Sequence, residues 1–317
     1  MLLVMPRPLM PLLLRYTSVV SLSGLLFVLN SCRHYLRKLN KDEYMQYLDS
    51  AYELALDMSR SCYPTYADGL KTRADFDAHA ARPFQRDNYT MLLYEEDDEA
   101  LGLIQFYVWD DDRYVQPDIF CIKKNYGRAV REFVEYLRGL YPGYELHFGV
   151  SHTNKEAVEA LERLGFEREA VSLVGVMRFE EYAPLPETAE TVRVTRENFS
   201  PFAALHAQWD DSMYWNSARL LEALDDWNIY MVQKGGTASA AVYFRYVAGS
   251  MEIFGVDFED DRFNAEDFRT LMVRALNQSK KDGMKDMTFF HEDETHPAVE
   301  SVGIRTIDTY YGHKLTL

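Results

Sequence analysis

The sequence has few cysteines, a deficit of basic residues and no apolar run long enough to cross a bilayer. Its 317 residues include three cysteines, Cys32, Cys62 and Cys121, and no Cys-x-x-Cys spacing. Three cysteines are too few for a disulfide framework or a structural zinc site, so we expect a reducing compartment. The 34 Lys and Arg against 50 Asp and Glu give a formal charge of −16. That charge disfavours binding to nucleic-acid phosphates, and we expect no nucleic-acid partner.

Acidic residues are absent from the first 41 residues, which therefore carry a charge of +6 against −22 for the remainder. Residues 16–32 are uncharged, but their dense apolar part, 19–29, is shorter than the about 20 residues of a bilayer span. Two interpretations of residues 1–34 stay open. They are either an upstream extension outside the fold or a secretory signal that ends in a lipidated Cys32. We expect a cytoplasmic protein, with membrane anchoring or export as the alternative if residues 1–32 act as a signal or anchor.

The length and the 47% hydrophobic content predict about two domains. The first, residues 35–179, has the hydrophobic pattern of a mixed α/β fold, and only residues 64–86 give no clear pattern. Strands are expected at 35–39, 89–94, 101–108, 118–122 and 144–150 and as a final pair within 171–179, and helices at 42–55, 128–137 and 154–163.

Residues 180–191 contain two prolines and no periodicity, and they are predicted to be a linker. The order of elements then repeats in residues 192–317, with almost no identity between the two copies. Strands are expected at 192–195, 229–233, 238–244, 251–258 and 287–290, helices at 198–208, 217–224 and 265–281, and a closing segment at 306–317.

A phosphate-binding loop is predicted after the strand that contains Asp118 and Cys121. Gly127 lets the backbone approach a ligand, and Lys123, Lys124 and Arg128 surround the start of the next helix with positive charge. Free N–H groups at a helix N-terminus bind anions, although an ordinary helix cap would use the same residues.

Two motifs in this region resemble those of the GNAT family of N-acetyltransferases. Lys124-x-x-Gly127-x-Ala129 is similar to the family's [QR]-x-x-G-x-[GA] loop, with Lys in place of Gln or Arg. Asn154-x-x-Ala157, followed by Leu164-Gly165-Phe166, is similar to its N-x-x-A and G-F signature. The resemblance covers about residues 35–179 and implies the α/β GNAT fold, with two tandem acyl-CoA transferase domains once the repeat is included.

The resemblance also implies acetyl-CoA as co-substrate and no metal. Backbone groups of Cys121, Ile122 and Lys123 would pair with its pantetheine arm, and Asn154 would face the same arm. The pyrophosphate would be held by the loop residues Lys124, Asn125, Tyr126, Gly127, Arg128 and Ala129.

Catalysis would be a direct attack by the amine of a small molecule or peptide within a ternary complex. The family often has a tyrosine that protonates the leaving thiolate, but this sequence has Leu161 there. A base must also take the amine proton. Asp118 and Glu145 are the candidates, with His147 as a third, and for each a solvated charge or a hydrogen-bonded histidine is the alternative. The sequence leaves the oligomeric state undetermined.

The second copy lacks the residues that the resemblance requires. Its loop, 259–264, has three acids and no glycine, and Glu292 and Val299 stand where Asn154 and Leu161 stand in the first copy. Since the acids would repel a diphosphate, we expect a degenerate GNAT fold there that does not bind CoA.

Other residues of the chain have an ordinary structural explanation beside a functional one. Four aromatic residues of the second copy are expected either to line an acceptor pocket or to belong to the core and its interfaces: Trp209, Tyr214, Trp215 and Trp227. His291, His296 and the acids 292–294 loosely resemble metal ligands, but their spacing fits no zinc motif and predicts a solvated loop. Asp110–Asp112 is predicted as a turn rather than a cation site. The alternative function for the whole chain is a catalytically inactive GNAT-like module that binds acyl-CoA or a protein.

Overall fold

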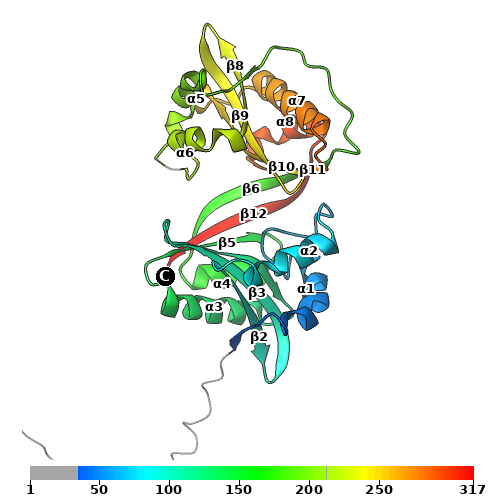
Figure 1. The fold of residues 1–317 in the computed structure, drawn as a ribbon, viewed down its shortest axis with the longest axis vertical. Coiled ribbons are helices and arrows are strands. Elements are labelled where there is room, and N and C mark those ends of the chain that lie inside the picture. The colour runs from blue at the N-terminus through cyan, green and yellow to red at the C-terminus, as the bar shows by residue number, and fades with distance from the viewer. Residues whose placement is uncertain (1–34, 212) are drawn as a thin grey trace, which may run out of the picture. The chain divides into compact units, whose positions relative to one another are not determined.

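A single mixed sheet of twelve strands organises the part of the chain that the structure describes. The computed structural model describes residues 35–211 and 213–317. The strand order across the sheet is β1-β2-β3-β4-β5-β12-β6-β11-β10-β9-β8-β7. The two predicted copies follow one another along it (Figure 1), and we call residues 35–178 the first half and residues 192–317 the second half.

The first half contains six strands and four α-helices among its described elements. The strands are β1 (Leu36–Lys38), β2 (Tyr89–Glu96), β3 (Glu99–Trp109), β4 (Tyr114–Ile122), β5 (Glu145–Ser151) and β6 (Glu167–Arg178). The helices are α1 (Leu48–Ala55), α2 (Arg73–Ala80), α3 (Tyr126–Leu140) and α4 (Lys155–Arg163).

The second half repeats this order after residues 181–191, which have no helix or strand. Its strands are β7 (Val192–Arg193), β8 (Asn228–Lys234), β9 (Thr237–Val247), β10 (Ser250–Phe258), β11 (Asp286–His291) and β12 (Arg305–Thr316). Its helices are α5 (Phe199–His206), α6 (Ser217–Glu222), α7 (Ala265–Lys281) and α8 (His296–Ser301).

The predicted mixed α/β fold is confirmed, and two details of the prediction are corrected. The expected strand pair within residues 171–179 is one long strand, β6, because both of its edges pair with strands of the second half. The unassigned stretch 64–86 contains α2, which begins with a capping box between Thr72 and Asp75. Residues 1–34, and with them both interpretations of that segment, lie outside the described residues. No helix among the described residues is long and apolar enough to cross a membrane.

The two halves exchange their last strands. β12, at the end of the second half, lies antiparallel between β5 and β6, with Gly312 opposite Gly149 on one side and Ala170 on the other. β6, at the end of the first half, pairs in turn with β11, where Gly175 lies opposite Phe289. Figure 1 shows β6 and β12 side by side where the halves meet. Each half therefore completes its sheet with a strand that the other half supplies.

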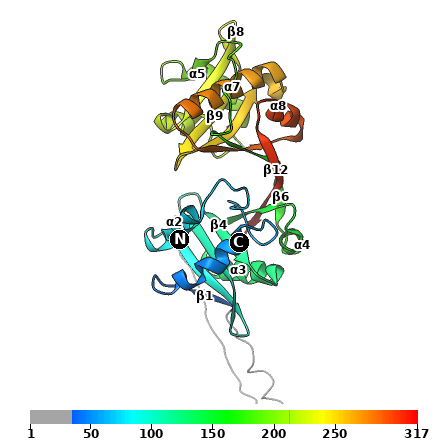
Figure 2. The ribbon, with the colours of Figure 1, turned by 90° about the vertical axis from the view of Figure 1, so that its right-hand side faces the viewer.

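Helices cover both faces of the sheet in each half (Figure 2). In the first half, α3 and α4 bury Phe133, Val134 and Leu161 against one face of the strands. Helices α1 and α2 bury Ala51 and Phe76 against the other face. Between these two helix layers, the pairing of the sheet is interrupted where β4 and β5 separate.

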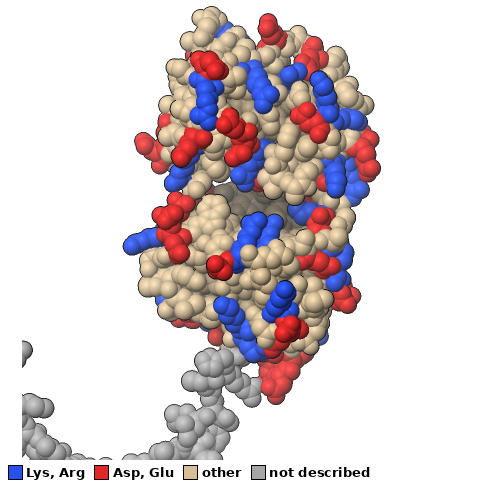
Figure 3. Space-filling view, in the orientation of Figure 1, with Lys and Arg blue, Asp and Glu red and all other residues tan. Residues whose placement is uncertain are grey.

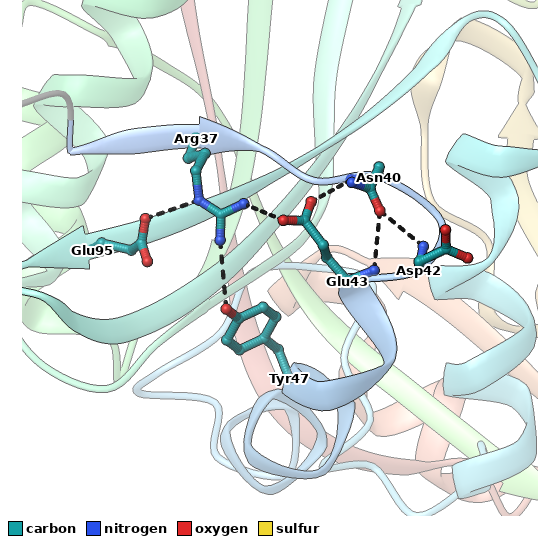
Figure 4. A network of polar contacts seen from close by, with 6 residues as sticks. All are labelled: Arg37, Asn40, Asp42, Glu43, Tyr47 and Glu95. Carbon is teal, nitrogen blue, oxygen red and sulfur yellow. Dashed lines mark hydrogen bonds and ion pairs between the residues drawn. The ribbon is translucent and has the colours of Figure 1, made fainter.

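Arg37 on the edge strand β1 fastens the start of the first half (Figure 4). Its guanidinium donates to Glu95 on β2 at 3.2 Å and to Glu43 at 2.9 Å. Glu43 in turn accepts from the Asn40 amide at 3.1 Å. Because β1 has only three residues, this network supplies much of what holds the strand in register.

We predict that Gly149→Ala destabilises the protein by about 2 kcal/mol through overpacking. A Cβ at Gly149 would lie 2.4 Å from the Tyr310 ring on the exchanged strand β12. Urea denaturation measures the change. Gly139→Ala is the matched control, because nothing lies within 4 Å of its Cβ position on the exposed side of α3. This control should raise stability by about 0.5–1 kcal/mol, and equal effects of the two substitutions would contradict the close packing between β5 and β12.

Candidate functional site

The strands β4 and β5 separate shortly after they begin, which opens a slot in the sheet of the first half. They pair in parallel only at Tyr114–Glu145 and Val115–Leu146. The register of β4 with β3 then shifts so that Asp118 has no partner, which is a β-bulge. Beyond the bulge the edge of β4 that carries Cys121 and Ile122 is turned away from β5. This edge of β4 is the one at which the family resemblance implies a pantetheine arm.

A segment of the protein itself, Arg60–Tyr63, occupies the slot. The Ile122 amide on β4 donates to the Arg60 carbonyl at 3.0 Å, and the Tyr63 amide donates to the Gly149 carbonyl on β5, also at 3.0 Å. Asn154 also turns to this segment, because its side-chain amide donates to the Ser61 carbonyl at 3.2 Å. Of the groups expected to face a ligand, the Ile122 amide and the Asn154 side chain are therefore bonded to residues 60–63, which we call the plug, whereas the Lys123 amide donates to the Leu101 carbonyl at 2.8 Å.

The plug is anchored by a buried carboxylate on the exchanged strand β12. Asp308 accepts hydrogen bonds from the Tyr63 hydroxyl at 2.5 Å and from the Ser151 hydroxyl at 2.9 Å. It also bonds His152 Nδ1 at 2.8 Å. The sequence analysis missed Tyr63, His152 and Asp308, because residues more than 150 positions apart meet only through the strand exchange.

Carboxylates neutralise the predicted phosphate loop. Glu99 Oε1 and Oε2 accept from Lys123 and Lys124, each at 2.8 Å. These hydrogen bonds lower the pKa of Glu99 to about 2, so both pairs persist at neutral pH. Arg128 lies 3.3 Å from Glu96, which also accepts from the Asn125 side chain at 2.7 Å.

The start of α3 already holds an anionic group. The Gly127 amide belongs to the first turn of the helix and donates to Glu156 Oε1 of α4 at 3.0 Å. Free N–H groups at a helix N-terminus favour negative charge, and here a carboxylate supplies it. Tyr126 and Ala129, predicted with this loop, are buried in the core beside it.

A cavity of about 380 Å³ lies along this helix start. It is lined by Asn125, Gly127, Arg128, Arg131, Glu156, Glu159, Ala160, Arg163 and Leu164. Three arginines and two glutamates face one another there, so displacement of the glutamates would leave a basic cavity next to the loop.

Of the predicted bases, Asp118 lies beside the slot and Glu145 does not. Asp118 is buried at the bulge and accepts from His79 Nε2 at 2.6 Å, while His79 Nδ1 accepts from the Tyr66 hydroxyl at 2.7 Å. Its second oxygen has no hydrogen-bond partner among the described residues. Glu145 is exposed at the opposite end of β5, near His147 at 3.6 Å and Lys314 at 3.8 Å.

The corresponding slot of the second half has no plug but an acidic entrance. β10 pairs with β11 only as far as Ile253, and a bulge at Phe254 follows, as in the first half. No backbone hydrogen bond from the described residues reaches the β11-facing edge beyond it. The loop after β10 carries Glu259, Asp260 and Asp261, and Asn264 caps α7 by accepting from the Glu266 and Asp267 amides. No backbone group of the described residues pairs with this edge, and the loop offers a diphosphate one cation, Arg262, against three acids.

Three of the four predicted aromatic residues of the second half, Tyr214, Trp215 and Trp227, form one cluster with Phe254. The rings of Trp215 and Trp227 lie 5.0 Å apart, and Trp227 lies 4.8 Å from Phe254. Tyr214 packs at the edge of the cluster, 5.2 Å from Trp215. His291 and His296 stack 5.9 Å apart, and within the described ranges no group of three His, Cys, Asp or Glu side chains could hold a metal ion.

Comparisons with solved structures show the fold. A GCN5-related N-acetyltransferase from Sphaerobacter thermophilus superposes with a TM-score of 0.58 at 14% identity, covering 88% of this chain and 94% of that one. A tandem GNAT protein from the clavulanic acid biosynthesis pathway, solved without AcCoA, gives 0.52 at 13% identity, covering 88% and 97%. The described chain therefore has the GNAT fold in tandem, as the sequence predicts.

A third structure matches across the same share of this chain. It is a GCN5-related glucosamine N-acetyltransferase region of a fungal multi-domain GH3 β-N-acetylglucosaminidase, with a TM-score of 0.55 at 10% identity, covering 88% of this chain and 38% of that one. No protein-family model and no curated protein matches the sequence. The likeness is thus one of fold.

We predict that Cys62 in the plug and Cys121 on β4 do not react with a thiol reagent in the native protein. Burial raises the pKa of Cys121 to about 12 and holds that of Cys62 well above its usual value, so both thiols stay protonated at about pH 8. In a Cys32→Ser variant, labelling followed by mass spectrometry should find no adduct before denaturation and two adducts after it. Rapid labelling of Cys62 in the native state would contradict a seated plug.

Proposed function

We propose that the protein is an acetyl-CoA-dependent N-acetyltransferase, in which the first half holds the co-substrate. An acetyl group would pass to the amine of a small molecule or peptide by direct attack in a ternary complex. The observation that carries the proposal is the cavity beside Gly127 and Arg128, at the mouth of the slot between β4 and β5 of a GNAT fold. The fold supports an acyltransferase in general, and the loop motif supports acetyl-CoA.

Binding requires two rearrangements in the first half. Residues 60–63 must leave the edge of β4 so that the Ile122 amide, flanked by Cys121 and Lys123, can pair with a pantetheine arm. Glu156 must also release the Gly127 amide, so that this N–H group of the helix N-terminus can donate to a phosphate oxygen instead. Lys124 and Arg128 would exchange their carboxylate partners for the same phosphates.

The acyl transfer itself would use groups that line the emptied slot. The amine nitrogen forms a bond to the thioester carbon, the carbon–sulfur bond breaks, and the amine proton must go to a base. Asp118 with His79 is the pair beside the slot, and it would take that proton, whereas Glu145 lies at the wrong end of β5. Backbone N–H groups of β4 would stabilise the oxyanion, and the departing thiolate would take its proton from water, because Leu161 is buried in the core.

The plug favours a second candidate function, an inactive GNAT-like module that binds a protein partner. Three hydrogen bonds from β4, β5 and Asn154 fix the plug, and its residues Ser61, Cys62 and Tyr63 are all buried. A slot that is permanently filled would leave the fold as a scaffold.

Calorimetric titration of acetyl-CoA into the full chain distinguishes the two candidates. We expect one site, weakened at least about tenfold in Arg128→Glu because repulsion replaces attraction at the phosphates. Arg138→Glu is the matched control, since Arg138 lies on the same helix but pairs with Glu135 on the surface, and it should bind like the parent. Mass spectrometry across an amine panel then identifies the acetylated product.

The same titration reports on the plug if it is repeated with the thiol reagent. Saturating acetyl-CoA should make Cys62 react, because its segment must leave the slot, while Cys121 on β4 remains slow. Absence of binding by a folded chain would refute the transferase and favour the scaffold. Binding without exposure of Cys62 would place the co-substrate outside the slot.

A further inference from the structure

Arg245 on β9 is surrounded by aromatic rings that come from three different segments. Its guanidinium carbon lies 5.0 Å from the ring centre of Phe254 on β10 and 5.7 Å from that of Trp215 in the loop before α6. It lies 5.8 Å from Trp227, just before β8. Rings over the faces of a guanidinium leave its in-plane N–H groups free to bind an anion.

Those N–H groups have no hydrogen-bond partner among the residues that the structure describes. No hydrogen bond or ion pair joins Arg245 to any of the described residues, and its Nε is buried without an acceptor. Buried polar atoms in proteins are almost always satisfied, so an orphan donor needs an explanation. A planar oxyanion such as a carboxylate matches the paired donors of a guanidinium edge.

Glu252 on β10 provides the opposite charge next to it. Arg245 and Glu252 are directly paired in the register of β9 and β10, so both side chains project from the same face of the sheet. Glu252 is half-buried and has no hydrogen bond or ion pair with the described chain. Burial raises the pKa of this carboxyl, although Arg245 and Lys71 oppose the shift.

The aromatic walls are held by a buried pair behind them. His206 Nδ1 bonds the Asp257 carboxylate at 2.6 Å, and His206 Nε2 donates to the Trp215 carbonyl at 2.9 Å. His206 is fully buried and stacks on Phe202 at 5.3 Å. Trp215, although it lies in a loop, is therefore fixed against Arg245.

The surface is hollowed where the two halves meet. Figure 3 shows a depression over β6 and β12, between the positions that α6 and α2 have in Figure 1. Lys and Arg alternate with Asp and Glu around it, without a continuous area of one sign. Concave sites with apolar walls and a few placed charges are typical of small-molecule binding.

We propose that this face of the second half binds a free amino acid or a similarly small amino-carboxylate. The ligand carboxylate takes the guanidinium edge of Arg245, its ammonium takes Glu252, and its side chain packs against Trp215, Trp227 and Phe254. We call this the Arg245 site. It does not rest on the proposed acetyl transfer, since it uses no residue of the first-half slot.

Tryptophan fluorescence of the full chain tests the site, because two tryptophans form its walls. Each standard L-amino acid except tryptophan is titrated in turn, with calorimetry on those that respond. We expect at least one saturable response with a dissociation constant below about 1 mM. The methyl ester and the N-acetyl derivative of that amino acid should each bind at least about tenfold more weakly, because each lacks one of the two charges.

Variants assign the response to Arg245 and Glu252. Arg245→Gln and Glu252→Gln should each weaken binding at least about tenfold. Arg274→Gln is the matched control, because Arg274 also has a buried Nε and lies 5.0 Å over a ring, that of Tyr230, but pairs with Glu187. Arg245→Lys retains the positive charge but lacks the paired N–H donors of the guanidinium. If Arg245→Gln does not unfold cooperatively, the affinity of Arg245→Lys is the test.

Three results would overturn the proposal. These are no response to any amino acid, unchanged binding in both Arg245 variants, or binding of the ester and the N-acetyl derivative as tight as that of the amino acid itself. Each result can arise whether or not the protein binds acetyl-CoA, so failure here is distinguishable from failure of the proposed transferase.

Discussion

The exchange of last strands between the halves is the constraint on which the rest of the structure depends. β12 supplies the neighbour that β5 lacks, and β6 supplies the neighbour that β11 lacks. Without the other half, β5 and β6 of the first half and β11 and β12 of the second half would have unpaired edges, and exposed edges of that kind associate or aggregate. The chain from residue 35 onward is consequently one compact unit although its sequence repeats one topology twice.

Through the exchanged strand β12, the second half also contacts the plug in the slot of the first half. Asp308 reaches from β12 to the Tyr63 hydroxyl, and Tyr63 is the last residue of the plug. A movement of β12 would remove that acceptor and leave a buried hydroxyl unpaired, which costs about 1–3 kcal/mol. Whether the slot is filled is therefore coupled to the position of a strand that belongs to the other copy, which a single GNAT domain could not achieve.

The sequence predicts the fold well because its signals are local. Helix α7 was expected at 265–281 and begins and ends there, since Asn264 caps it and an apolar face runs along it. The loop at Gly127 was placed correctly at the start of α3. What the sequence could not reveal is which groups bond to the loop and slot. Nothing in the sequence marks Glu156, Glu99 or residues 60–63 as partners of the loop or the slot. Only the tertiary structure brings the two carboxylates to the loop and the Arg60 carbonyl to the Ile122 amide.

The two halves differ at the loop that follows the fourth strand of each copy and at the slot between the fourth and fifth strands. The first retains the basic loop and Gly127 but fills its slot, whereas the second keeps an open edge on β10 and has three acids where the loop would carry cations. Those acids do not disfavour a small zwitterion. Its carboxylate and ammonium would pair with Arg245 and Glu252, which lie directly opposite each other on β9 and β10. Electrostatics over such a short distance dominates over net charge, which solvent and salt screen. The second half is thus better suited to a small amino-carboxylate than to a nucleotide. The first half, once residues 60–63 leave the slot, is better suited to a nucleotide.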